Sequence, residues 1–163
     1  MSEEKDRAKA KARPKPEEEL ARLAAEVRTL ESLSDALRDM VIRIQALITE
    51  LGIAGRTLDG ISGQEGAEVL IPIGAGSLLR ASLKDVDKVI VSLGADVAIE
   101  VDVEKAKEII GDRLAEAQKA LRDYLARLGE VERALEARRE RIRTLLEARG
   151  RAGGAEEGVK QNP

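Results

Sequence analysis

The chain offers few residue types for catalysis. Its 163 residues include no histidine and no cysteine. Imidazole bases, thiolate nucleophiles and the usual zinc ligands are therefore missing, and only carboxylates and hydroxyls remain for chemistry. The Gly-Ala-Gly-Ser stretch at residues 74–77 could suggest a phosphate loop, but such a loop leads from a strand into a helix. Here it joins two segments of alternating polarity, so we interpret it as a hairpin turn.

Three aspartates could in principle bind a divalent cation. Asp85, Asp87 and Asp96 lie close together in the sequence, and Ca²⁺ and Mg²⁺ both prefer oxygen ligands. These residues lack the spacing, the glycine and the terminal glutamate of an EF-hand loop. We therefore expect solvated turn carboxylates, no metal site, no cofactor and no enzymatic activity.

The longest patterns in the sequence are two heptad runs that flank a short central region. In a heptad run, apolar residues alternate at spacings of three and four, and such a stripe keeps facing one partner only if two helices supercoil. The first run contains Leu20, Leu23, Val27, Leu30, Ser34, Leu37, Val41, Ile44, Ile48 and Leu51. The second contains Ile110, Leu114, Ala117, Leu121, Tyr124, Leu128, Val131, Leu135, Arg138, Ile142 and Leu145. The similar lengths predict that the two helices pair with each other, antiparallel.

Ser34 and Arg138 are the two residues that interrupt these stripes. We expect Ser34 to loosen the seam or to set its register. Arg138 allows two interpretations. Its aliphatic stem lies along the apolar seam while the guanidinium stays in water, or it marks the point where the two helices separate.

The composition agrees with a helical seam rather than a thick globular core. The chain has one tyrosine and no phenylalanine or tryptophan, whereas a two-helix seam is filled by Leu, Ile and Val. No apolar run approaches the ~20 residues that span a bilayer, and the charged N-terminus has no signal-peptide core. We expect a cytoplasmic protein. The net charge of −3 gives no reason to expect nucleic acid or membrane as a partner.

Between the runs the apolar period changes from 3.5 to two, which predicts strands. Four strands are expected, at 69–73, 79–83, 89–93 and 97–101, and Gly94 suits the first position of a type II′ turn. The sequence thus predicts an α+β fold: helix 17–58, two β-hairpins within 68–101, and helix 103–149. Gly52 and Gly55 leave open whether the first helix continues through them. Disordered tails are expected at 1–16, which is basic, and at 150–163.

Four short strands with one apolar face and open edges are marginal by themselves. Because we expect the helices to cover each other, no segment remains to cover the strands. We therefore predict an oligomer in which the strands of several subunits meet. The residues expected at this contact are Val69, Ile71, Leu79, Ala81, Val89, Val91, Val97 and Ile99.

The central region closely resembles the alpha subunits of archaeal prefoldins. The resemblance rests on residues 69–77 (VLIPIGAGS) and 85–100 (DVDKVIVSLGADVAIE) with a heptad arm on either side, and it covers about residues 17–149. It implies an ATP-independent holdase in which two alpha and four beta subunits combine their hairpins into a double β-barrel body. It also implies that coiled-coil arms capture unfolded polypeptides and pass them to a group II chaperonin.

The resemblance further implies that clients contact the ends of the arms. The matching positions are Leu20, Leu23, Val27, Leu135, Ile142 and Leu145. The alternative interpretation that these residues only close the seam remains open. Two other functions also remain: a gamma-type prefoldin subunit that builds filaments, and a structural coiled-coil scaffold that binds no client.

Overall fold

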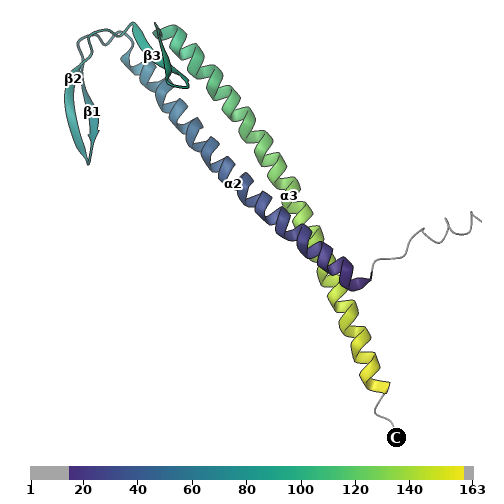
Figure 1. Cartoon of the computed structure of the whole chain (residues 1–163). Helices are drawn as coiled ribbons and strands as arrows, with labels where there is room; N and C mark the ends of the chain where they lie inside the picture. Colours follow the sequence, from purple (N-terminus) through teal and green to yellow (C-terminus); the bar gives the residue numbers. More distant parts are fainter. Residues whose placement is uncertain (1–14, 160–163) are drawn as a thin grey trace, which may run out of the picture. The chain divides into compact units, whose positions relative to one another are not determined.

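The computed structural model describes the backbone of residues 15–159 and the side chains of residues 15–151. Its elements are two long helices with four strands between them (Figure 1). In chain order they are α2 (Pro16–Ile61), β1 (Glu68–Gly74), β2 (Ser77–Ser82), β3 (Lys88–Gly94), β4 (Val97–Asp102) and α3 (Val103–Val159). This order confirms the predicted α+β fold, in which one helix precedes and the other follows two antiparallel hairpins along the chain.

The chain divides into two compact units, each with parts of both helices. The helical unit consists of residues 15–39 and 125–159, and the hairpin unit consists of residues 40–124. Every heptad position predicted above is buried or half-buried, including Leu37 and Val131 in the helical unit and Leu51 and Ala117 in the hairpin unit. The heptad pattern therefore identified the apolar seam correctly in both units.

Helix α2 continues through both glycines that could have ended it. Pro16 and three glutamates occupy its first turn, where negative charge suits the helix dipole. Gly52 and Gly55 each cost about 1 kcal/mol relative to alanine. The helix nevertheless extends to Ile61, because Leu51 is buried in the seam on one side of these glycines and Leu58 is half-buried on the other. Packing thus outweighs the low helix propensity.

Helix α3 begins where predicted but ends later. The backbone N–H of Val103 donates a hydrogen bond of 2.9 Å to the carbonyl of Asp87, which satisfies a free donor of the first turn. The expected end near Arg149 differs from the structure, in which the helix reaches Val159. Gly150 lowers helix propensity without forcing the chain out of the helix. The rest of the predicted tails, residues 1–14 and 160–163, lies outside the described residues.

Both hairpins have the same register and the same kind of turn. Ile71 pairs with Leu79 in the first hairpin and Val91 with Ile99 in the second. Gly94 pairs with Val97, so the two-residue loop is Ala95-Asp96. The φ angles of Ala95 and Asp96 are 47° and 60°. Positive φ at both positions defines a type I′ turn, so the predicted type II′ turn beginning at Gly94 is wrong.

The positive φ of Ala95 leads to a stability prediction. Glycine adopts this conformation without the steric cost that alanine carries. We expect Ala95→Gly to raise the free energy of unfolding by about 0.5–1 kcal/mol, after allowance for the greater freedom of glycine in the unfolded chain. The measurement is the urea midpoint followed by circular dichroism.

A second alanine of the same hairpin provides the control. Ala98 is exposed on β4 and has no positive φ, so Ala98→Gly should lower stability by about 0.5–1 kcal/mol. A decrease for both variants would contradict the assigned turn geometry.

Candidate functional site

The first hairpin exposes apolar side chains on both of its faces. Ile71 and Leu79 are cross-strand partners on one face, while Leu70 lies on the other. Together with Ile73 and Leu78, these side chains are between 45% and 64% exposed. An isolated two-stranded hairpin is marginal in water, and a contiguous exposed apolar patch marks an interaction site. The first hairpin is therefore a surface that requires a partner.

The second hairpin packs one face against the helices of its own unit. Val91 of β3 is only 7% exposed, and Ala106 of α3 is fully buried. A guanidinium N–H of Arg113 donates a hydrogen bond of 2.7 Å to the carbonyl of Ser92, which fixes β3 against α3. The expectation that the helices leave every strand uncovered is therefore wrong for this hairpin. Its inner face stabilises the subunit itself.

The outer face of the second hairpin is exposed and mixed in polarity, because Ile90 lies opposite Glu100, which pairs with Lys88 at 3.5 Å. Ile90, the residue before Val91, is 73% exposed. A hollow of about 440 Å³ adjoins β3 and is lined by residues of α2, β3 and α3, among them Leu58, Ile90 and Ile110. This outer face and the first hairpin together form the candidate assembly surface.

The predicted contact residues differ in exposure, and those of the second hairpin lie on its inner face. Ile71, Leu79 and Val97 are exposed; Val69, Ala81, Val89 and Ile99 are half-buried; and Val91 is buried. Four further residues of this region were not predicted although all are more than half exposed: Leu70, Ile73, Leu78 and Ile90. A signal for the first two was present, because residues 69–73 are apolar at consecutive positions, a pattern typical of a strand covered on both faces.

The helical unit brings the six predicted client-binding residues into one seam. Leu23 and Leu135 are buried, and Leu20, Val27, Ile142 and Leu145 are half-buried. In this structure the seam is closed, so two of these side chains are covered and the other four are exposed only in part. Their role in client binding stays a prediction. Leu146, the neighbour of Leu145, is the exposed apolar residue of this region at 52%.

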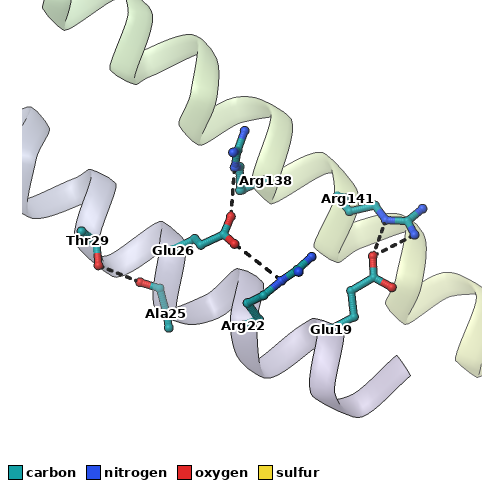
Figure 2. A network of polar contacts seen from close by, with 7 residues as sticks. All are labelled: Glu19, Arg22, Ala25, Glu26, Thr29, Arg138 and Arg141. Atoms are coloured by element: carbon teal, nitrogen blue, oxygen red, sulfur yellow. Dashed lines mark hydrogen bonds and ion pairs between the residues drawn. The ribbon is translucent and has the colours of Figure 1, made fainter. Parts of the chain in front are cut away.

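Ion pairs bridge the two helices beside this seam. Arg138 donates from Nε to Glu26 at 3.2 Å, and the same carboxylate pairs with Arg22 at 3.6 Å (Figure 2). Arg141 donates from Nε to Glu19 at 2.9 Å. The Arg138 guanidinium thus reaches solvent and a partner while its stem occupies the seam, which agrees with the first of the two interpretations.

Three further pairs extend this series within the helical unit. Glu31 pairs with Arg139 at 2.7 Å, Glu132 pairs with Arg38 at 2.7 Å, and Glu17 pairs with Arg149 at 3.3 Å. Exposed pairs of this kind each contribute about 0–1 kcal/mol. Their alternating positions along the two helices fix the antiparallel register more than they add stability.

Ser34 places an unsatisfied polar group inside the seam. The residue is 2% exposed, and its hydroxyl has no hydrogen-bond partner among the described residues. A surface hollow of about 470 Å³ lies beside it, lined by Leu135 and by the Glu31–Arg139 and Arg38–Glu132 pairs. A buried hydroxyl without a partner costs about 1–3 kcal/mol. This agrees with the expectation that Ser34 loosens the seam.

Lys107 links the two helices of the hairpin unit. Its ammonium group lies 3.1 Å from Glu104 and 3.2 Å from Asp59. The hydrogen bond with Glu104 and then that with Asp59 raise the pKa of Lys107 above its usual value. A raised lysine pKa stabilises the folded state at neutral pH, and the contribution is lost only as the pH rises past that pKa.

Comparison with known proteins identifies the family. The family model for prefoldin subunits matches residues 30–148. A prefoldin subunit alpha from Methanopyrus kandleri is 39% identical over 64% of this chain and 67% of its own length. Another from Methanobrevibacter smithii is 31% identical over 67% of this chain and 75% of its own length. The chain belongs to the prefoldin family.

A solved structure agrees with this assignment. The cryo-EM structure of filamentous prefoldin from Methanocaldococcus jannaschii is similar with a TM-score of 0.61 and 25% identity, covering 69% of this chain and 94% of the other. Within the part of the chain that the structure describes, no helix is long and apolar enough to cross a membrane.

Substitutions at two neighbouring residues of β3 test folding and assembly separately. Val91→Asp would put a carboxylate among buried apolar side chains of the hairpin unit, and we expect it to lower the free energy of unfolding by several kcal/mol. Ile90→Asp changes the exposed face, so we expect normal helix content but loss of the oligomer. Circular dichroism and native mass spectrometry measure the two effects.

Each variant has an outcome that would contradict its prediction. If Ile90→Asp still forms the native oligomer, the outer face of the second hairpin is not part of the assembly surface. Normal stability of Val91→Asp would contradict the packing of β3 on the helices.

Proposed function

We propose that this chain is a subunit of an ATP-independent holdase of the cytoplasm. Its hairpins join those of other subunits in a β-barrel body, and the ends of its paired helices capture unfolded polypeptides for delivery to a group II chaperonin. The observation that carries the proposal is the first hairpin, which exposes Leu70 and Ile71 on opposite faces. Two apolar faces require cover, and membership of the prefoldin family makes other prefoldin subunits the partners we propose.

The composition that we propose for the assembly is two copies of this chain with four prefoldin beta subunits. The relatives named prefoldin subunit alpha support this choice. Native mass spectrometry of the complex isolated with this chain from its source cells tests it. The expected mass contains two copies of this chain and four copies of a second, coiled-coil subunit.

A homopolymeric filament is the second candidate, and one observation favours it. The similar solved structure is described as filamentous. In that case the same native mass spectra would show a ladder of masses that differ by one copy of this chain, with no second subunit. A lone dimer would contradict both assemblies and favour a coiled-coil scaffold.

The proposed capture mechanism depends on several weak contacts. The apolar residues at the ends of one helix pair form a small patch, so a single contact with a client is weak. Several subunits that close on one unfolded chain gain affinity because each further contact is intramolecular. Such binding is reversible and requires no nucleotide in this proposal.

Two substitutions test the client-binding residues. Leu20 and Leu145 are half-buried at the seam, and the double variant Leu20→Glu, Leu145→Glu replaces apolar surface with charge. We expect the double variant to suppress the aggregation of a denatured client roughly tenfold or more less effectively than the unsubstituted chain. Every copy of the helix pair in the assembly then carries the weakened contact, so the reductions in affinity multiply. Light scattering measures the aggregation.

Leu125→Glu is the matched control. Leu125 is a leucine of α3 outside the predicted site and is 46% exposed, so its replacement should change neither assembly nor protection of the client. Full protection by the double variant would remove these residues from the client site.

A further inference from the structure

Helix α2 carries a second apolar line beside its seam in the hairpin unit. The residues that flank a two-helix seam are usually charged or polar. On one flank of α2 they are instead apolar and recur every seven residues: Met40, Leu47, Ala54 and Ile61. The corresponding residues of the other flank are Gln45, Gly52 and Asp59. We call the four apolar residues the α2 flank. They make α2 apolar over a wider face than one partner helix covers.

The α2 flank leads from an exposed helix surface into the hollow beside β3. Met40 is 38% exposed and Leu47 is 45% exposed. Ala54 and Ile61 are half-buried and line the hollow of about 440 Å³. Because seven helical residues advance by about 10.5 Å, Leu47 lies one such step from the hollow. The exposed leucine and the hollow therefore belong to one continuous apolar surface.

The hollow lies along the free edge of β3. Its lining includes Ile90 and Val91, which belong to opposite faces of β3, and no residue of β4 is among the lining residues. Among the described strands, β3 pairs only with β4. The backbone N–H and C=O groups of its other edge are therefore free, and such an edge readily accepts a further strand.

A strand added to this edge would lie over the α2 flank and place alternate side chains in the hollow. Strand β2 of the first hairpin suits this position. Its partner β1 contains Pro72, which has no backbone N–H to donate, whereas β2 contains no proline. Leu79 of β2 is 54% exposed. The first hairpin of the same chain does not line the hollow, so we look to the β2 strand of another copy.

We propose that β2 of a second copy of this chain pairs with the free edge of β3 and covers the α2 flank. Leu79 of that copy then enters the hollow, and the contact extends from the strands onto Leu47 of the helix. The proposal rests on the proposed function for the existence of an assembly. It applies to the assembly of two copies with four beta subunits and to the filament, because both contain more than one copy of this chain.

Crosslinking between two versions of the chain tests this contact. The chain has no native cysteine, so each version carries a single one, Leu79→Cys or Ala54→Cys, and a different tag. The two versions are produced together in the source cells, and the native assembly is treated with a short bifunctional maleimide. Because each version has one cysteine, a crosslink between the tags joins two copies. We expect a strong crosslinked band on a denaturing gel.

Ile53→Cys in place of Ala54→Cys is the matched control. Ile53 is 51% exposed, but it is turned by about 100° around the helix from Ala54 and does not line the hollow. We expect this version to lose the crosslink to Leu79→Cys.

A substitution on the exposed part of the α2 flank tests its contribution to association. Leu47→Glu places a carboxylate where the strand of the second copy would cover it, so we expect the association of the two copies to weaken roughly tenfold or more. Ile53→Glu, a similar change on another face of α2, should leave association unchanged. Native mass spectrometry over a dilution series measures association, and circular dichroism checks that both variants fold.

The outcomes separate this contact from the assembly as a whole. If the assembly has its normal mass and Ala54→Cys crosslinks no better than Ile53→Cys, the proposed contact is wrong and the proposed function stands. Equal association of Leu47→Glu and Ile53→Glu would likewise overturn it. If the unsubstituted chain enters no assembly with more than one copy, the proposed function fails and the contact fails with it.

Discussion

The antiparallel seam between α2 and α3 is the interaction on which the rest of the structure depends. Its buried residues in the described part of the chain include Leu23, Leu37, Val41 and Leu51 of α2 and Ala117, Val131 and Leu135 of α3. Because the seam supplies the main apolar cover of both helices, it permits helices far longer than usual without a thick core. A hydrogen bond from Val103 to Asp87 continues the pairing of β3 with β4 into the start of α3. The second hairpin then packs on the helices through Val91, and the first hairpin is left without cover.

This division of apolar surface explains how one small chain can serve as a subunit. In the helical unit and on the inner face of the second hairpin, apolar side chains are covered by other residues of the same subunit. The subunit therefore has a defined fold. The first hairpin cannot, because both of its faces expose large apolar side chains. Stability within the subunit and the requirement for partners therefore reside in different residues. Val91 and Ile90, which are adjacent in the sequence, show the division most clearly: Val91 is buried, and Ile90 is 73% exposed, the largest value among the large apolar side chains that the structure describes.

Much of the fold could be predicted because it follows from local periodicity. A repeat of 3.5 residues over ten positions admits few structures other than a paired helix, and the change to a period of two gave the strands within one or two residues. The errors arose where a non-local contact or a local backbone angle decided the outcome. The turn type depends on the φ angles of Ala95 and Asp96, and glycine at position 94 misled the prediction. The burial of Val91 depends on Ala106, which belongs to another element. The unpaired state of the Ser34 hydroxyl likewise required the partner helix to be in place.

The central claim is that clients are held at the ends of the helix pair. Site-specific photo-crosslinking tests it most directly, with a photoreactive residue at Leu146, which is 52% exposed beside the predicted site, or at Ile42, which is 62% exposed in the hairpin unit. The assembly carrying each probe is irradiated together with a denatured client, and the adducts are quantified. We expect client adducts at Leu146 and few at Ile42. Adducts at Ile42 alone, or equal amounts at both positions, would contradict client binding at the ends of the helix pair.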